Sequence, residues 1–542
     1  MTTTVIICCY LGLLLLLGLV SNRFFRGTTA DYYFVASRGI GPFLLLMSLF
    51  GTTMTAFALL GSTGASFKDG IGIYGKLASS SGIVHALCFF LIGVKLWSLG
   101  AKHGYLTQIQ FFRDRFQSDF IGLLLFPILV GLVIPYLLVG LIGAGSTFSS
   151  ASDGKVSFEA GAAIICIVVL IYIFFGGARG TAWANCFQTI VFIALGMVAF
   201  AIISSKLGGP VAATAAVAER NPSKLQRSAH QKDLEKFQAA LKAYEAAQAN
   251  AATNTNSTTG TPPETATLTP PKEPKGLPQL VFLSYMLIPL SVGMFPHIFQ
   301  HWLTAKSASS FKLPVIAHPL LILLVWVPTV LLGTWATSAM VNGQPLIPPG
   351  SSPNAVLSIM VNELTTPVLG GFLTAGIMAA IMSSLDSQFL CLGSIFTNDI
   401  YLHYKRDKEI GEQQKVLASR IFVVGVVVVA YLIACYLKNT REIFFLGIWC
   451  FSGFAALVPL VVAALYWRRV TPAGAYASIL TTAVAWIWLF VQSDFGANRG
   501  FLFLGMMPVA SLVIASTIAL VVVSLATPRM DDKVLEKFFP SK

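Results

Sequence analysis

Charge is scarce in this chain. Charged residues make up 11 % of its 542 residues and hydrophobic residues 55 %, whereas soluble proteins carry about 25 % charged residues. This composition excludes a soluble protein. The eight cysteines all fall within apolar runs and form no Cys-x-x-Cys pair, so neither a disulfide framework nor a zinc site is indicated. The sequence also lacks a nucleophile–base pair, a metal-ligand cluster and a phosphate-binding loop, which argues against an enzyme.

The chain is instead rich in long apolar runs, each close to the ~20 residues that cross a bilayer. We therefore predict an all-α polytopic membrane protein with about 13 transmembrane helices. The runs are 4–22, 41–65, 73–99, 120–148, 159–176, 181–204, 278–304, 313–340, 368–400, 417–437, 443–466, 472–491 and 501–526. The first run has no cationic residue before it and no small-residue cleavage site after it, which favours a retained span over a signal peptide.

The basic residues predict the orientation. Arg23, Arg26 and Arg38 follow the first run, so its C-terminal end is expected in the cytoplasm. Alternation then places the N-terminus outside and the C-terminus inside, in the plasma (inner) membrane. Few basic residues fall in the short segments assigned outside, namely Lys68, Lys76, Lys155, Lys438, Arg441 and Arg499. The net charge of +13 thus reflects topology, and no basic patch on a soluble domain indicates nucleic-acid binding.

Residues 206–277 interrupt the apolar pattern. The stretch 219–249 is charged and Ala/Gln-rich, with Leu234, Phe237, Leu241 and Tyr244 at helical spacing. The stretch 250–275 is rich in Thr, Pro and Asn and is expected to be disordered. The topology places this insert outside the membrane. It is interpreted either as a short helical hairpin with a tether or as an arm that docks a partner.

The run 368–400 carries polar groups at mid-membrane. Ala380, Ser383, Ser384 and Ser387 follow the i, i+3, i+4, i+7 spacing that places them on one helical face, with Asp386 beside it. An acid at this depth is costly and normally faces a partner, a cavity or an ion. The small residues and hydroxyl oxygens leave room for a dehydrated cation, which indicates transport across the membrane.

The run 41–65 contains a second unusual stretch, in which Gly51 is followed by Thr52, Thr53 and Thr55. Gly and β-branched residues weaken a helix, and non-helical backbone at this depth must be buried or line a cavity. Freed carbonyls at such a break form sodium sites in many transporters. A Gly/Thr packing seam between helices is an equally good interpretation of this run alone.

Six segments, in order, resemble the sodium/solute symporters, a family that includes proline, pantothenate, monocarboxylate, sialic acid and sugar carriers. Gly176–Gln188 is similar to the family pattern G-G-x-x-A-V-x-W-T-D-x-x-Q, and Tyr466–Ala475 to W-K-R-x-T-x-x-G-A. The other segments are Asp31–Gly39, Tyr105–Phe116, Phe295–His297 with Gln300–Ser307, and Ala380–Gln388 with Thr397–Tyr401. The resemblance covers nearly the whole chain except 206–277.

The resemblance implies a leucine-transporter-type fold of two inverted five-helix repeats, with alternating access coupled to Na+. It divides the chain into an extra first helix and loop (1–40), a first repeat (41–205, spans 2–6), the insert (206–277), a second repeat (278–470, spans 7–11), two C-terminal spans (471–526) and a cytoplasmic tail (527–542). The family's main sodium site matches the backbone carbonyls of Gly51, Met54 and Ala380 and the hydroxyls of Ser383 and Ser384.

The chain departs from the family at several positions. Proline carriers have an acid where this chain has Thr53, and the sixth-span acid is replaced by Asn185. Relatives with a second sodium site use that acid and ninth-span hydroxyls, and the matching ninth-span positions here are Asp386 and Ser387. In one interpretation, Asp386 on the ninth span takes the place of the sixth-span acid in a second sodium site that also includes Asn185 and Ser387. In the other, Asp386 only hydrogen-bonds neighbouring helices and no second ion binds.

The solute pocket is expected around the break. Candidates are Thr52, Thr53, Thr55, His85, Ser291, Phe295, His297 and Trp449. His85 is equally well explained as an interhelical hydrogen-bonding residue, and aromatic residues such as Phe57 and Trp449 either gate the pocket or pack. Half-helix N-termini favour an anionic group, and no cluster of amides is present to bind sugar hydroxyls. A small carboxylate or amino acid is therefore favoured.

The predicted function is sodium-coupled import of a small organic solute. The alternatives are a symporter for a sugar or another solute, a transporter-like membrane sensor, a membrane enzyme and a passive channel. The expected partners are the solute, Na+ and the lipid bilayer, with no cofactor and no obligate protein partner.

Overall fold

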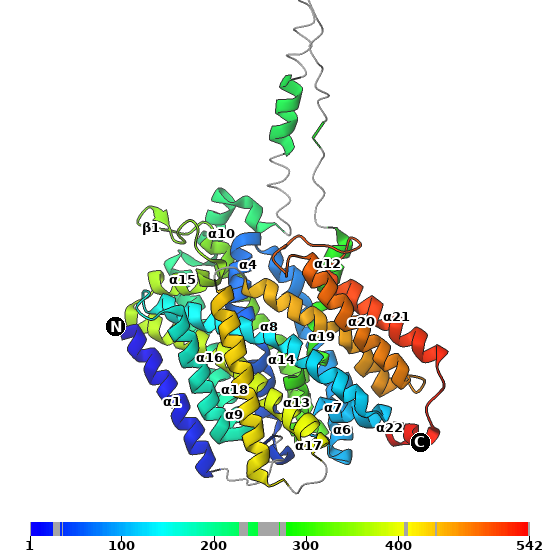
Figure 1. The fold of residues 1–542 in the computed structure, drawn as a ribbon. Helices are drawn as coiled ribbons and strands as arrows, with labels where there is room; N and C mark the ends of the chain where they lie inside the picture. Colours follow the sequence, from blue (N-terminus) through cyan, green and yellow to red (C-terminus); the bar gives the residue numbers. More distant parts are fainter. Residues whose placement is uncertain are drawn as a thin grey trace, which may run out of the picture.

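The computed structural model describes residues 2–24, 33–34, 36–226, 237–247, 270–271, 278–405, 410–438 and 442–539. Helices dominate these residues, and one short hairpin pairs β1 (Met340–Val341) with β2 (Gln344–Pro345) (Figure 1). The helices are α1 (Thr2–Phe24), α3 (Pro42–Thr53), α4 (Ser62–Asp69), α5 (Ser79–Cys88), α6 (Val94–His103), α7 (Gln108–Phe116), α8 (Asp119–Ala151), α9 (Phe158–Lys206), α10 (Gly209–Arg220), α12 (Gln279–Tyr285), α13 (Pro296–Thr304), α14 (Lys312–Ala336), α15 (Val356–Leu364), α16 (Pro367–Ile395), α17 (Leu402–Tyr404), α18 (Glu412–Leu437), α19 (Ile443–Tyr466), α20 (Pro472–Gln492), α21 (Pro508–Ala526) and α22 (Asp532–Phe538).

The expected all-α polytopic membrane fold is confirmed. In the described part of the chain, 9 helical stretches are long and apolar enough to cross a membrane, and two bent helix pairs raise the number to 11. One of the 9 stretches, α9, has 49 residues, or about 70 Å at 1.5 Å per residue, more than twice a bilayer's hydrocarbon core. The sequence places two runs in α9, 159–176 and 181–204. The total of about 13 spans stays a prediction.

Gly177 divides α9 into two halves. Its backbone has φ of +54° and ψ of −159°, far from helical values. A Cβ atom at this position would lie 2.9 Å from Cδ2 and 3.0 Å from the carbonyl oxygen of Tyr33. Glycine is therefore required both by the left-handed φ and by the close approach of Tyr33.

The two chain ends lie at opposite ends of the helix bundle. The Thr3 hydroxyl donates to the carbonyl oxygen of Pro367 at 3.0 Å, where α16 begins next to α15. At the other end, α22 buries Leu535 and Phe538, and Lys537 pairs with Asp114 in α7. In Figure 1 helix α1 starts at its upper end, and α22 lies at the lower right. Termini on opposite sides require an odd number of crossings.

Helix α16 forms the centre of the bundle. Nearly all of its side chains are buried, because α1, α3, α8, α9, α13 and α18 pack around it. By contrast, α18 exposes large apolar side chains such as Ile421 and Leu432, as expected for a helix that faces lipid. The polar groups of α16 therefore lie far from both water and lipid.

The start of the insert packs against the bundle instead of forming a detached arm. Arg220 donates to the carbonyl oxygen of Ser338 at 2.9 Å, and the Asn221 amide donates to the carbonyl oxygen of Thr337 at 3.0 Å. Gly70, with φ of +86°, lies so close to Lys224 that a Cβ would be 2.4 Å from the Lys224 carbonyl oxygen. A second helical stretch covers 237–247, and most of the stretch expected to be disordered, 250–275, lies outside the described residues.

Replacing residues 228–276 with a flexible linker should leave folding and solute uptake unchanged, because the anchoring contacts of Arg220, Asn221 and Lys224 lie before the deleted stretch. Extending the deletion back to Gly209 should lower the apparent melting temperature, since it removes the contacts of Arg220, Asn221 and Lys224. Thermal unfolding and initial uptake rates of the two deletions check this expectation. Loss of uptake in a well-folded 228–276 deletion would contradict it.

Candidate functional site

The first broken helix consists of α3 and the segment after it. It bends at Met54, about one turn after Gly51, the position that the sequence indicated. Helix α3 continues through Gly51 and ends at Thr53, Met54 adopts a non-helical conformation, and the chain resumes as a π-helical turn, η2 (Phe57–Gly61). The two halves differ in direction by 54°. The last four carbonyl groups of a helix have no intrahelical donor. The break therefore frees the carbonyl of Gly51 while keeping that residue helical.

Three of the five predicted main-site residues meet around Ser383. Its hydroxyl oxygen lies 2.7 Å from the carbonyl oxygen of Gly51 and 3.1 Å from that of Ala380. All three residues are fully buried. Helix α16 supplies two of these oxygens and the end of α3 the third, so the arrangement depends on the contact between the two helices.

The other two main-site residues are close by but engaged differently. The Ser384 hydroxyl accepts a hydrogen bond of 2.6 Å from the Gln388 amide, one turn further along α16. Met54 is the C-cap of α3, and it lines a neighbouring cavity. Gln388 was not among the predicted site residues, although its i+4 spacing from Ser384 is visible in the sequence.

Asp386 is held by neutral hydrogen-bond donors. The Tyr172 hydroxyl donates to Oδ2 at 2.8 Å and the Ser387 hydroxyl to Oδ1 at 3.1 Å. With its amide nitrogen turned toward the carboxylate, Asn185 lies 2.9 and 2.8 Å from the two oxygens. Asp386 is fully buried, and no cationic side chain among the described residues forms an ion pair with it. Asn185, Asp386 and Ser387, the three residues predicted for this cluster, are therefore in contact.

Thr52 joins this cluster together with a histidine that the sequence analysis missed. The hydroxyls of Thr52 and Ser387 are 2.8 Å apart, and Nε2 of His301 lies 3.0 Å from the Ser387 hydroxyl. His301 comes from α13 and Tyr172 from α9. His301 falls in the segment Gln300–Ser307 that resembles the family, which is the one sequence feature that pointed to it.

A cavity lies where the two broken helices meet. Four predicted pocket residues line it: Thr53, His85, Ser291 and Phe295. The cavity also has hydroxyl groups from Ser81 and Tyr136 and an aromatic wall, and none of its lining side chains carries a formal charge. The aromatic wall consists of Phe57, Phe295, Trp326 and Phe451.

The second break supplies one edge of the cavity. The 3₁₀ segment η6 (Ile288–Gly293) leads into α13 with a bend of 48°, and Ser291 and Phe295 come from either side of the bend. The first amide groups of α13 have no intrahelical acceptor, so a partial positive charge lies at this edge.

His318 of α14 was not predicted as a site residue. It contacts the end of α3 beside the cavity. Its Nε2 lies 3.1 Å from the Thr53 hydroxyl, and its ring packs edge-on against His85 with centroids 5.3 Å apart. The Thr53 hydroxyl lies 3.0 Å from the carbonyl oxygens of both Leu49 and Phe50. It can therefore donate to the end of α3 while accepting from His318.

The remaining pocket candidates do not line the cavity. Thr55 accepts a hydrogen bond of 3.0 Å from the backbone amide of Phe57 and thereby caps the second half of the broken helix. His297 is buried and stacks on Phe295 with centroids 5.1 Å apart. Trp449 packs against Phe490 at 5.3 Å, in a cluster between α19, α20 and α21. For Trp449 the structure therefore favours packing over gating.

Two helices broken at mid-membrane around one cavity are typical of secondary transporters. The sequence model of the sodium:solute symporter family matches residues 33–482. The chain therefore belongs to the sodium:solute symporter family. It is a multi-pass membrane transporter and not an enzyme, and its coupling ion is Na+.

Similar proteins agree with this assignment. Sodium/proline symporters of Staphylococcus aureus strains JH9 and JH1 are each 24% identical over 500 residues, which cover 90% of this chain and 86% of each relative. The solved structure of a Na+-coupled sialic acid symporter in a substrate-bound, outward-open state has a TM-score of 0.71 at 16% identity, covering 98% of this chain and 99% of its own. A nucleobase-cation-symport-1 family transporter in a closed conformation has a TM-score of 0.51 at 12% identity, covering 94% and 98%. The leucine-transporter-type fold is thus confirmed.

Proposed function

We propose that this protein imports a small carboxylate or amino acid together with Na+, by alternating access of two inverted repeats (41–205 and 278–470). The observation that carries the proposal is the junction of the two broken helices, where freed backbone oxygens lie beside a cavity for a small solute. A tenfold Na+ gradient supplies about 1.4 kcal/mol per ion. A membrane potential of 100 mV adds about 2.3 kcal/mol per net charge.

The main sodium site is assigned to the carbonyl oxygens of Gly51, Met54 and Ala380 and the hydroxyls of Ser383 and Ser384. Hard cations prefer oxygen ligands. Ser383 already brings two of the carbonyl oxygens within 2.7 and 3.1 Å of its own. Rotation of the Ser383 hydroxyl hydrogen away from both carbonyls would leave the lone pairs of all three oxygens free for one cation.

The cavity supports a small solute with an apolar body. Its lining combines a few hydroxyls and His85 with aromatic rings. A sugar would leave several hydroxyls without partners, which is costly in a buried site. A carboxylate would face the amide groups at the start of α13, and Na+ would balance its charge. The sodium/proline symporters among the relatives also favour an amino acid.

Asp386 with Asn185 and Ser387 is proposed as a second sodium site. An ionised carboxylate at this depth needs a balancing cation, and the described neighbours that hydrogen-bond to it are neutral. The Ser387 oxygen would be a further ligand, and the Asn185 amide would turn its oxygen in place of its nitrogen toward the ion. A structural, protonated Asp386 is the alternative, and the stoichiometry experiment below separates the two.

The end of the bundle that holds α7 and α22 is proposed to face the cytoplasm. Lys and Arg residues gather there, among them Arg113, Arg115, Arg468, Arg469 and Lys537, as the positive-inside rule expects. This orientation places the N-terminus and the insert outside.

Uptake into vesicles tests the proposed function. Purified protein would be reconstituted, and uptake of labelled proline and of a panel of amino acids, small carboxylates and sugars would be measured with and without a Na+ gradient. Accumulation of an amino acid or carboxylate only with inward Na+ supports the proposal. Sodium-driven uptake of a sugar alone would overturn the solute class, and uptake indifferent to Na+ would contradict the coupling.

Ser383→Ala should raise the Na+ concentration for half-maximal uptake by about tenfold or more, because a buried ligand oxygen worth at least about 1.4 kcal/mol is lost. Ser394→Ala is the matched control. Ser394 is also buried in α16, but its hydroxyl lies 3.4 Å from the Asn398 amide and outside the site. Sodium titrations of uptake compare both variants with wild type. Equal sodium dependence in all three would remove Ser383 from the coupling site.

Asp386→Asn should lower the charge moved per solute by one if Asp386 balances a second Na+. If the acid is protonated and structural, the ratio should stay the same. Simultaneous measurement of current and labelled-solute flux in proteoliposomes gives the ratio. Asp494→Asn, an exposed position in the turn after α20, controls for the substitution itself.

A further inference from the structure

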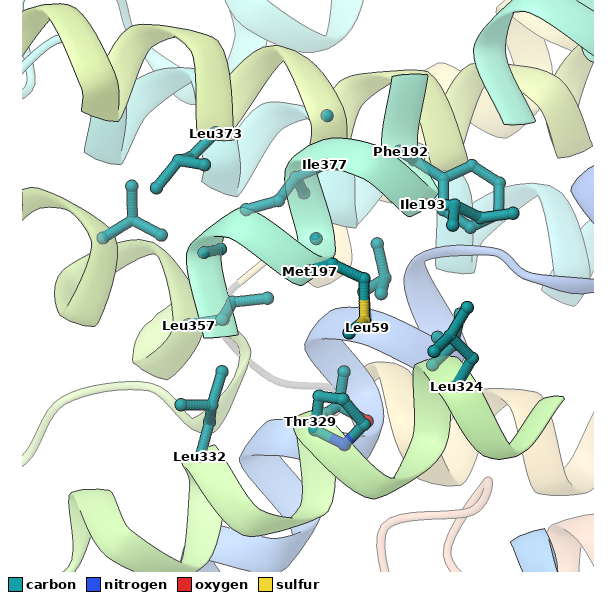
Figure 2. Close-up of a pocket in the computed structure, with 16 residues that line it drawn as sticks. Leu59, Phe192, Ile193, Met197, Leu324, Thr329, Leu332, Leu357, Leu373 and Ile377 are labelled. Atoms are coloured by element: carbon teal, nitrogen blue, oxygen red, sulfur yellow. The ribbon is translucent and has the colours of Figure 1, made fainter. Parts of the chain in front are cut away.

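A second cavity lies on the other side of α14 from the solute cavity. It is lined by residues of α9, α14, α15, α16 and η2 (Figure 2). Leu59 from η2 lies on its wall, as do Ile377 from α16 and Leu357 from α15. In the solute cavity, η2 instead contributes Phe57 and Ala58, and α14 contributes Trp326. Helix α14 and η2 thus have one cavity on each side.

The lining of this second cavity offers nothing to a polar ligand. Thr329 is the one hydroxyl-bearing residue among the side chains that line it. Its oxygen already accepts from the Ser62 hydroxyl at 2.8 Å and donates to the carbonyl oxygen of Trp326 at 3.2 Å. The other lining residues are aliphatic or aromatic side chains, glycines, a methionine and a proline. A headgroup, a carboxylate or a sugar would lose its hydration there without gaining a partner.

The cavity opens sideways, into the bilayer. The exposed lining residues are Gly196 and Met197 of α9 and Leu324 of α14, whereas the floor residues Val361 and Ile377 are only 1% and 6% exposed. Other apolar side chains of α9 and α14 are exposed as well, among them Val198, Leu320 and Leu323. Both helices cross the membrane at this level, so the solvent at the mouth is hydrocarbon.

We propose that this cavity binds one acyl chain of a membrane phospholipid, which enters between α9 and α14 while its headgroup stays at the bilayer surface. The apolar lining, the lateral opening and the absence of a free polar partner along the lining all fit a hydrocarbon chain. The occupant would touch η2 just after the first break and Gly376, one turn before Ala380. It would therefore contact α16, which supplies two of the oxygens around Ser383, and the second half of the broken helix, whose first half, α3, supplies the third.

Glycine 196 provides a direct test of occupancy. A Cβ built at Gly196 meets nothing within 4 Å, so Gly196→Leu should fill the mouth without a clash. Gly131→Leu is the matched control, because Gly131 is an exposed glycine of α8 whose Cβ also meets nothing within 4 Å. Met197→Trp narrows the same mouth from an exposed position. It provides an independent test if Gly196→Leu does not fold.

The probe is a phosphatidylcholine with a diazirine at the end of one acyl chain, mixed into vesicles that contain the intact protein. After irradiation, mass spectrometry maps the labelled peptides. Label is expected on Val361 and Ile377, which lipid around the protein cannot reach. Labelling there should fall at least fivefold in Gly196→Leu and in Met197→Trp but not in Gly131→Leu. Label confined to exposed residues such as Leu320, or floor labelling that is equal in all variants, would overturn the proposal.

Discussion

The whole site depends on one constraint, which is that polar backbone groups inside a bilayer must find partners within the protein. Ending α3 at Thr53 frees carbonyl groups at a depth where each unsatisfied group costs several kcal/mol. The Ser383 hydroxyl satisfies the Gly51 carbonyl at 2.7 Å. The break in α3 therefore requires α16 beside it, fully buried and with hydroxyls on the facing side. The same oxygens are the ligands that a dehydrated Na+ needs, so the structural requirement and the proposed coupling site coincide.

The spacing of residues within single helices made much of this site predictable. Ala380, Ser383 and Ser387 lie on one face because of helical periodicity, and the Gly-Thr-Thr run correctly indicated a weakened helix near Gly51. Residues that join from elsewhere were not predictable this way. His301 and Tyr172 reach the Asp386 cluster from α13 and α9, and His318 reaches Thr53 from α14. No spacing along the chain encodes these meetings, which are set by helix packing.

The insert and Trp449 show two other limits of sequence analysis. Composition marks 206–277 as foreign to the apolar pattern, but it cannot show that Arg220 and Asn221 bind the segment after α14 or that Gly70 must be small to admit Lys224. An aromatic residue in a span is equally compatible with a gate and with packing. For Trp449 the choice is made by its neighbours Trp486 and Phe490, which lie about 40 residues further along the chain, on α20.

Helix α14 and η2 separate two cavities of opposite character. On one side, Thr53, His85 and Ser291 give the wall a few polar groups; on the other, Thr329 is the one hydroxyl, and both of its bonds are internal. The alternating access proposed here would need helices around these two cavities to move relative to one another. Close-packed side chains resist such movement, whereas a hydrocarbon chain can be displaced and readmitted from the bilayer. In the proposed cycle, an apolar cavity that is open to lipid and lies next to the broken helix would give the surrounding helices a deformable neighbour.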